Sequence, residues 1–183
     1  MTLGFTFNGE HSSAYGIGVR SVDRTVMPER RRQEFTILGR SGTLELVSDE
    51  YEKRTIVVSI GLMYQDTFPE LRQKVRALAG WLRGSGFLIF DDEPDKAYEA
   101  TVYSAIGIEQ LELQPRGVCE VQFECQPFAV SDELHKHTFN GQGTVETAIT
   151  NAGNATTCGR IIITNTGTAP ITDIYITRKA VIS

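Results

Sequence analysis

DTFPELRQKVRALAGWLRG, residues 66–84, separates two apolar segments, TIVVSIGLMY (55–64) and FLIFDD (87–92). Within it, apolar residues recur at the i, i+4, i+7, i+8 and i+11 spacing of one buried helical face. They are Leu71, Val75, Leu78, Ala79 and Leu82. Most of the remaining sequence alternates in the manner of β-strands. The pattern therefore predicts one amphipathic helix packed on a largely β domain.

The residues at the two ends of this stretch agree with a helix over about 67–83. Asp66 or Thr67 can cap its N-terminus, and Pro69 suits the first turn. Gly84 follows the last apolar residue, as expected at a helix C-terminus. Its polar face carries no catalytic residue, which favours a scaffold over a reactive site.

The predicted fold class is mainly β, with a β-sandwich or barrel-like first domain that carries this one helix. Alternation at the cysteine-containing strand implies antiparallel pairing with one face in water. The segment Gly39-Arg40-Ser41-Gly42 joins two strands and is interpreted as a hairpin turn or a short loop. The expected strands of this domain are Gly4–Asn8, Gly16–Arg20, Gln33–Leu38, Thr43–Val47, Thr55–Tyr64, Phe87–Phe90, Tyr98–Ile108 and Val118–Phe128.

Composition changes near residue 130, and we expect two domains, 1–130 and 131–183. All of the net charge of −5 and most aromatic residues precede the change, whereas the second segment is rich in Thr, Gly and Asn. A β-sandwich needs on the order of 100 residues, so the second segment predicts only part of one. Its expected strands are Val145–Thr150, Arg160–Asn165 and Ile171–Thr177.

Charge and hydropathy narrow the class of protein. A net charge of −5 and a pI near 5.3 argue against nucleic acid as the main ligand. The sequence shows no apolar run long enough for a bilayer and no secretion signal at its start. We therefore expect a soluble protein without a membrane partner.

The three cysteines predict no disulfide. Cys119 and Cys125 fall on one face of a strand, where six extended residues separate the sulfurs by roughly 20 Å. They read as small core residues, and Cys158 stands alone in a Thr- and Gly-rich loop. Metal-ligand spacing such as CxxC does not occur.

The acidic cluster Asp91-Asp92-Glu93-Pro94-Asp95 is the one segment that could bind Ca²⁺ or Mg²⁺. It lacks the Gly and distal Glu spacing of an EF-hand, and a solvated turn explains it better. The three histidines are scattered, and no GxSxG or GxxxxGK[ST] motif occurs. The sequence thus predicts no enzyme, no metal site and no cofactor.

Arg30, Arg31 and Arg32 form a local basic patch in an acidic chain, supported by Arg20, Arg24 and Arg40. One interpretation is an electrostatic docking site for an acidic face of a partner or of an adjacent subunit. The other is a solvated loop that follows Pro28. Candidate contact residues are therefore Arg30, Arg31, Arg32, Gly39, Arg40, Ser41 and Gly42.

Six segments of the first domain follow one another in order: FTFNGEHSSAYGIGV, FTILGRSGTLEL, YEKRTIVVSIGL, AGWLRGSG, LIFDDEPDKAYEATV and VQFECQPF. In this succession they resemble the distal tail protein family of long-tailed, non-contractile bacteriophages. The resemblance covers roughly residues 3–130. Residues 151–177 look like the beginning of that family's second domain, a galectin-like or carbohydrate-module-like β-sandwich.

The resemblance implies a structural virion protein at the tail tip, assembled in the host cytoplasm and serving host attachment. It implies a homohexameric ring as part of the baseplate hub, in contact with the tail tube protein and with baseplate or fibre proteins. The alternatives are a carbohydrate-binding β-sandwich module, suggested by the Thr- and Asn-rich second segment, or another β-rich adaptor. Phe139 and Tyr175 are the only aromatic residues of that segment, which favours the structural hub.

Overall fold

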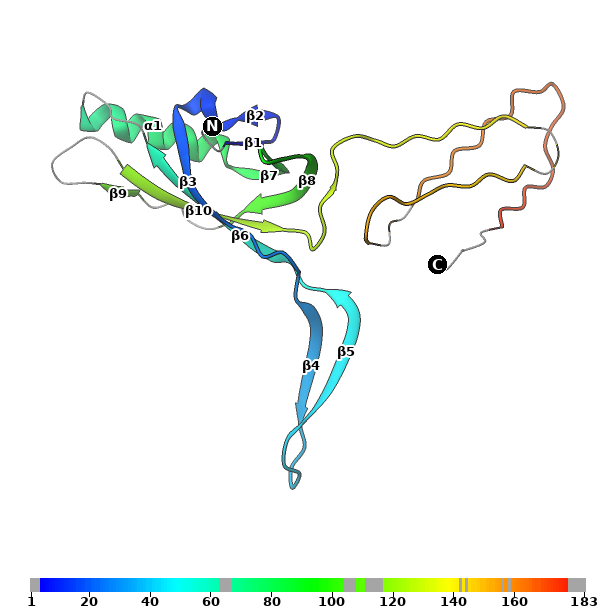
Figure 1. Ribbon diagram of the computed structural model, residues 1–183, viewed down its shortest axis with the longest axis horizontal. Helices are drawn as coiled ribbons and strands as arrows, with labels where there is room; N and C mark the ends of the chain where they lie inside the picture. Colours follow the sequence, from blue (N-terminus) through cyan, green and yellow to red (C-terminus); the bar gives the residue numbers. More distant parts are fainter. Residues whose placement is uncertain are drawn as a thin grey trace. The chain divides into compact units, whose positions relative to one another are not determined.

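The computed structural model describes residues 4–62, 67–103, 108–110, 117–141, 143, 145–155, 157 and 159–177. The chain forms two units, residues 1–138 and 139–183, each of which is described by itself. In the first unit, the strands belong to two antiparallel sheets, and one α-helix covers part of the larger one (Figure 1). The mainly β fold class predicted from the sequence is confirmed.

The larger sheet has nine strands, seven of which follow the order β2-β1-β7-β8-β10-β6-β3. Two short strands lie off this path, with β11 beside β8 and β9 beside β10. The bounds are β1 (Phe5–Phe7), β2 (Glu10–His11), β3 (Ile17–Asp23), β6 (Arg54–Leu62), β7 (Gly84–Phe90), β8 (Glu93–Val102), β9 (Ile108–Gln110), β10 (Gly117–Cys125) and β11 (Val130–Ser131). A 3-10 helix, η1 (Ser12–Tyr15), follows β2.

The helix α1 (Phe68–Trp81) confirms the helix expected over about 67–83. Thr67 is the N-cap: its side chain accepts from the Glu70 N–H, and the Glu70 carboxylate accepts from the Thr67 N–H. This reciprocal capping box satisfies two donors that the first helical turn leaves without partners. Leu82 is the C-cap, and Gly84 takes a φ of +93°, which favours glycine.

The core lies between α1 and the inner face of the sheet. Leu71, Leu78 and Leu82 of the predicted stripe are buried, and Val75 packs against the same cluster. Ala79 was expected in the stripe but is exposed, because the real contact face is narrower than the sequence pattern. Each buried leucine contributes roughly 1.5–3 kcal/mol of hydrophobic stabilisation.

Every second side chain of β6 and β10 is buried, and these side chains form the other side of the core. The two strands pair over their whole length, so their inward side chains lie next to one another. The buried residues are Ile56, Val58, Ile60 and Leu62 of β6 and Cys119, Val121, Phe123 and Cys125 of β10. Outward residues of β10, such as Glu120 and Gln122, are exposed. The larger sheet therefore has one apolar and one polar face.

Trp81 joins the end of α1 to the N-terminal strands. Its indole Nε1 donates to the Phe7 carbonyl oxygen at 3.1 Å, and its ring stacks on Tyr15 with centroids 4.4 Å apart. Phe5 stacks on the same indole at 5.5 Å. Trp81 is therefore a core anchor, as the sequence indicated, and not an exposed platform for a ligand.

Cys119 and Cys125 are buried free thiols, in agreement with the prediction from their spacing. Burial raises the pKa of the Cys125 thiol to about 11. The expectation for Cys158 lies outside the described residues.

Strand β8 of the first unit begins earlier than its alternation indicated. β8 begins at Glu93, five residues before the expected Tyr98, and includes Pro94 and Lys96. It does so because β7 and β11 pair with its first half, and the hydrogen bonds of the ladder outweigh poor strand propensity. β11 also carries the sheet to Ser131, beside the domain boundary expected near residue 130.

The second unit contains no helix and no strand among its described residues. The strands expected at Val145–Thr150, Arg160–Asn165 and Ile171–Thr177 are therefore not formed there, although the chain runs back and forth in extended segments (Figure 1). Alternating side chains make a stable strand only when a ladder and a packed face accompany them. Here the apolar side chains are half exposed or more, namely Ile161, Ile162, Ile163, Ile171, Ile174, Tyr175 and Ile176.

Candidate interaction site: the arm and its base

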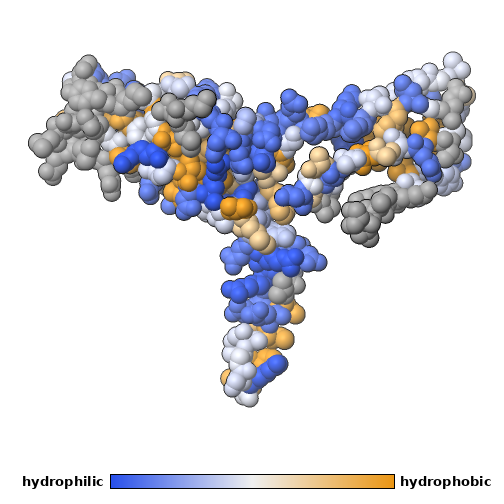
Figure 2. All heavy atoms as spheres, viewed as in Figure 1, coloured by the Kyte–Doolittle hydropathy of each residue, from blue (hydrophilic) through white to orange (hydrophobic). Residues whose placement is uncertain are grey.

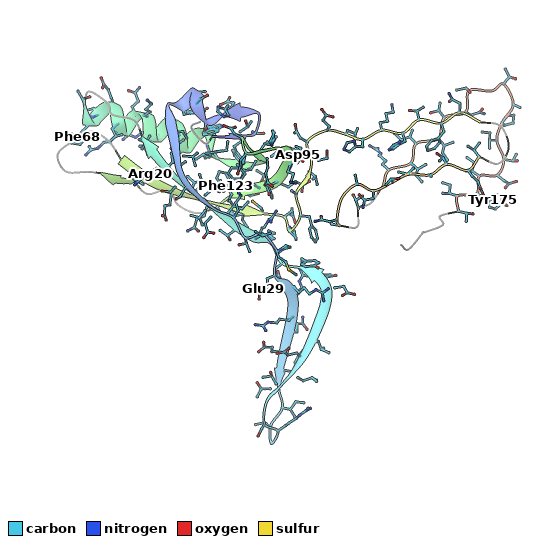
Figure 3. The ribbon with its side chains drawn as sticks, in the orientation of Figure 1. Arg20, Glu29, Phe68, Asp95, Phe123 and Tyr175 are labelled. Carbon is cyan, nitrogen blue, oxygen red and sulfur yellow. The ribbon has the colours of Figure 1, made fainter. Side chains whose placement is uncertain are left out.

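A two-stranded hairpin projects from the first unit and forms the smaller sheet, made of β4 (Arg30–Thr36) and β5 (Thr43–Tyr51). We call residues 29–52 the arm. At its root, the Glu52 N–H donates to the Glu29 carbonyl oxygen at 2.8 Å. Seven residues of β4 extend over about 23 Å, and all seven are exposed. Figure 3 shows side chains pointing away from both faces of the hairpin beyond Glu29.

The predicted turn forms the tip of the arm. Gly39 and Gly42 both take left-handed φ values, +83° and +89°, which a residue with a Cβ rarely adopts. The Arg40 N–H donates to the Ile37 carbonyl oxygen at 3.2 Å. The hairpin turn predicted for residues 39–42 is therefore present, with the exposed Leu38 beside it.

The three consecutive arginines lie on β4 at the root of the arm, and not in a loop after Pro28. Each of the three has a carboxylate within 4.0 Å. Arg31 binds Glu50 at 2.6 Å and Glu52 at 2.8 Å, and the hydrogen bond and charge of Glu52 raise the pKa of Arg31. Arg30 lies 4.0 Å from Asp49, and Arg32 lies 3.5 Å from Glu34. The sequence could not reveal this pairing, because the β4–β5 register sets it.

The structure separates the candidate contact residues into two groups. Arg30, Arg31 and Arg32 lie at the root, and Gly39, Arg40, Ser41 and Gly42 lie at the far tip. The supporting arginines are also dispersed: Arg20 is on β3, and Arg24 contacts the turn before β8. The predicted single basic patch is therefore not present as one surface.

Sequence reasoning missed an apolar face on the distal half of the arm. Phe35 lies opposite Leu44, and Leu46 lies two pairs nearer the root on the same face. These three side chains are 46%, 42% and 55% exposed, and Leu38 at the tip is fully exposed. Figure 2 shows hydrophobic residues gathered on the distal arm and hydrophilic ones at its root. Alternation in FTILGRSGTLEL was the available signal, but it did not reveal that the apolar face lacks a core.

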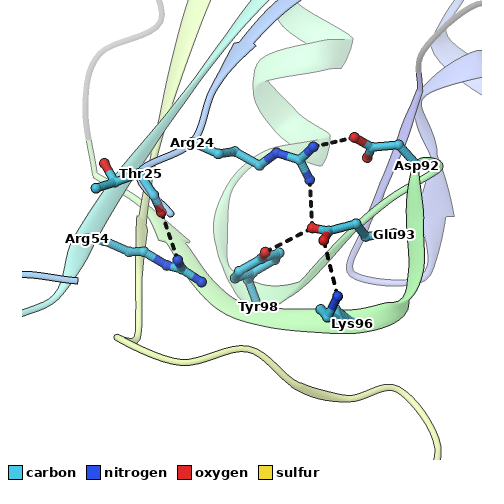
Figure 4. Close-up of polar contacts among 7 residues, drawn as sticks. All are labelled: Arg24, Thr25, Arg54, Asp92, Glu93, Lys96 and Tyr98. Atoms are coloured by element: carbon cyan, nitrogen blue, oxygen red, sulfur yellow. Dashed lines mark hydrogen bonds and ion pairs between the residues drawn. The ribbon is translucent and has the colours of Figure 1, made fainter. Parts of the chain in front are cut away.

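A network of charged and aromatic side chains holds the base of the arm (Figure 4). Arg24, just after β3, binds Glu93 at 3.1 Å and Asp92, and its guanidinium lies 4.6 Å from the Phe90 ring centroid. Lys96 and Tyr98 bind Glu93 as well, at 3.1 Å and 3.3 Å.

Arg54, at the start of β6, secures the other side of the base. It donates to the Thr25 carbonyl oxygen at 3.0 Å and lies 4.6 Å from the centroid of the Tyr98 ring. Both chain segments that lead into the arm are thus attached to β8 and its turn. The network positions the arm on the first unit.

The carboxylates Asp91, Asp92 and Glu93 of the acidic cluster each pair with a basic side chain. Asp92 and Glu93 belong to the base network, and Asp91 lies 3.1 Å from His11 Nε2. Nδ1 of that imidazole accepts the Ser13 N–H at 3.2 Å, so His11 caps η1. Among the described residues, no group of three or more His, Cys, Asp or Glu side chains could hold a metal ion.

The second unit has two similar loops that sequence reasoning did not connect. Asn151 accepts the Gly153 N–H and donates to the Ala155 carbonyl oxygen, at 3.0 Å and 2.8 Å. Asn165 makes the same contacts with Gly167 and Ala169, at 2.9 Å each. The repeated N-x-G-x-A spacing was the available signal. These loops are turns closed by an Asn side chain.

Comparison with known proteins identifies the family to which this chain belongs. A family model described as "Phage tail protein RIFT-related domain" matches residues 13–125, which include the arm, α1 and six strands of the larger sheet, β3, β6, β7, β8, β9 and β10. Because the match covers more than half of the chain, the protein belongs to this family of phage tail proteins. It is a component of the virion tail. No curated protein matches the chain.

One solved structure agrees with this class: the Dit (gp 19.1) protein of phage SPP1, described as a hub of the adsorption apparatus in phages that infect Gram-positive bacteria. The two are 19% identical with a TM-score of 0.57, over 69% of this chain and 51% of that one. The chain thus spans about half the length of that protein. The family match and the shared fold confirm the predicted relationship to siphophage distal tail proteins. Among the described residues, no helix is long and apolar enough to span a membrane.

Proposed function

We propose that this protein is the structural subunit of a closed six-fold ring at the distal end of a phage tail. The ring joins the tail tube protein to baseplate or fibre proteins, and its role is non-catalytic. Membership of the phage tail protein family supports the structural role. The likeness to a protein described as an adsorption hub supports the place in the tail.

The observation that carries the proposal is the arm with its uncovered apolar face. A hairpin of two strands is only marginally stable in water unless another surface packs on it. The distal arm exposes Phe35, Leu44, Leu46 and Leu38, so isolated subunits leave a hydrophobic surface in water. A neighbouring copy that covers this surface removes that cost and adds stability to both copies.

The geometry of the arm is compatible with a ring. The arm extends away from the larger sheet, so the surface that it reaches on a neighbour differs from the arm itself. A contact between two different surfaces of identical subunits is heterologous, and repetition of such a contact closes into a ring when the rotation permits. Residues 39–42 at the tip are the part of the arm placed to reach a neighbour or the tube protein.

The matched test replaces residues on one face of the arm and then on the other. Leu44→Ser with Leu46→Ser removes apolar side chains, whereas Thr36→Ser with Thr43→Ser makes small changes on the opposite face. Native mass spectrometry and negative-stain imaging measure the assembly. We expect rings for the wild type and the threonine variant, and monomers for the leucine variant. Wild-type protein that stays monomeric at high concentration would contradict the ring.

Contact with the tail tube needs a separate test. Reversal of Arg30, Arg31 and Arg32 is unsuitable, because it would place like charges beside Glu50 and Glu52 and disturb the arm itself. Arg40→Glu at the tip avoids this, since Arg40 has no described carboxylate within 4.0 Å. Rings that form but no longer bind purified tubes would place the tip against the tube. Monomers would place it between subunits.

A further inference from the structure

The helix α1 and its C-terminal end carry positive charge without carboxylate partners. Residues 67–83 hold four basic side chains and one acidic one, Glu70, which is occupied in the capping box. Among the described residues, none of the four has a carboxylate within 4.0 Å. The four basic residues are Arg72, Lys74, Arg76 and Arg83.

The three arginines share one exposed flank of the helix. They follow the i, i+4 and i+11 spacing, which places them within about 40° of one another around the axis. All three are exposed. Lys74 differs, because it is half-buried and its Nζ would lie 2.9 Å from a Cβ added to Gly16. We call Arg72, Arg76 and Arg83 the α1 stripe; over 11 residues it spans about 16 Å.

The chemistry of the stripe suits a chain of phosphates. A guanidinium group binds a phosphate through two parallel hydrogen bonds, and its charge does not depend on pH in the physiological range. Three such groups spread over about 16 Å reach further than one phosphate ion can. The stripe therefore fits several phosphates that are joined in one molecule.

The stripe lacks the features that favour a protein or a nucleic acid base as its ligand. Protein interfaces have an apolar centre that is rich in aromatic residues. In the part of the chain that the structure describes, none of the exposed large apolar side chains lies on α1. Single-stranded nucleic acids stack their bases on aromatic side chains, but Phe68 and Trp81 of α1 pack against the core instead.

We propose that the α1 stripe binds a flexible polymer of polyol units joined by phosphodiesters. Such a polymer presents phosphates without bases, which is what the stripe can contact. A flexible chain can follow the stripe and then turn away from the protein. A rigid duplex would bring further phosphates toward the rest of a chain whose net charge is −5. The inference goes beyond the proposed ring, since each copy carries the whole stripe.

Isothermal titration calorimetry of the whole protein with a synthetic glycerol phosphate polymer tests the proposal. Arg72→Gln with Arg76→Gln should weaken binding at least tenfold. It should also lower the slope of log affinity against log salt by about 1.4, the value for two lost phosphate contacts. The matched control is Arg20→Gln with Arg40→Gln, which removes two exposed arginines that also lack a described carboxylate partner and should change binding little.

A second variant separates a direct contact from damage to the helix. Arg72→Lys with Arg76→Lys keeps the charge but loses the paired hydrogen bonds, so its affinity should lie between those of the wild type and the glutamine variant. Glutamine and lysine both favour helices, and circular dichroism should show α1 intact in both variants. Equal losses in the α1 variants and in the control variant would overturn the proposal.

Two competing polyanions of matched charge identify the ligand. Polyglutamate and a single-stranded oligonucleotide should both bind more weakly than the glycerol phosphate polymer. Equal binding of polyglutamate would show a general attraction of opposite charges, and tighter binding of the oligonucleotide would assign the stripe to nucleic acid. Either result overturns the proposal, as does wild-type protein that does not bind the polymer. None of these results bears on the proposed ring.

Discussion

Arg24 and Glu93 form a 3.1 Å ion pair at the base of the arm, across a separation of 69 residues in the sequence. The same guanidinium lies 4.6 Å from the Phe90 ring centroid, so one side chain joins the segment that leads into the arm to the core.

We expect Arg24→Met to lower the free energy of unfolding by about 1–2 kcal/mol, through loss of charged hydrogen bonds and a cation–π contact. Urea unfolding followed by circular dichroism measures it. Arg72→Met is the matched control, since Arg72 has no described carboxylate partner, and it should change the free energy by less than about 0.5 kcal/mol. Equal effects of the two substitutions would show that the base network does not stabilise the fold.

Leu78→Asp should prevent folding. Leu78 is fully buried between α1 and the sheet, and an unpaired buried carboxylate costs several kcal/mol. The adjacent Ala79→Asp changes an exposed position and should remain folded. Cooperative thermal unfolding of soluble Leu78→Asp would refute the assignment of α1's buried face.

Trp81→Phe should destabilise the protein by about 1–2 kcal/mol, because the hydrogen bond from Trp81 Nε1–H to the Phe7 carbonyl oxygen is lost.

Trp81 is the only tryptophan, so its fluorescence reports on this site alone. Tyr15→Leu removes the stacked ring and should shift the emission to longer wavelength without unfolding the sheet. An unchanged spectrum would mean that the two rings are not stacked in solution.

The stability contributed by Cys125 should fall at alkaline pH. Burial raises the pKa of this thiol from 9.0 to about 11 in the folded protein, so the unfolded chain loses the proton first as pH rises. The contribution is complete below pH 9.0 and is lost between pH 9.0 and about 11. Denaturant unfolding of wild type and of Cys125→Ala across this range measures it. A constant difference between the two proteins would contradict the raised pKa.

The sequence was sufficient for elements whose stability comes from local pattern. The α1 helix followed from a 3.6-residue period, a capping Thr67 and the glycine after its end. The β6 and β10 strands followed from strict alternation. The sequence also predicted strands in the second unit that are not formed there. Alternation indicates only which side chains share a face. Without a paired strand and a packed layer, those residues remain extended and exposed.

The sequence by itself determined the mainly β fold with one helix, because periodicity and caps act between neighbours in the chain. Only the tertiary structure decided the character of the candidate site. Arg31 looked like part of a free basic patch until the β4–β5 register placed Glu50 and Glu52 beside it. Charge pairing depends on distances of a few ångströms between residues far apart in sequence, and only the folded chain sets those distances.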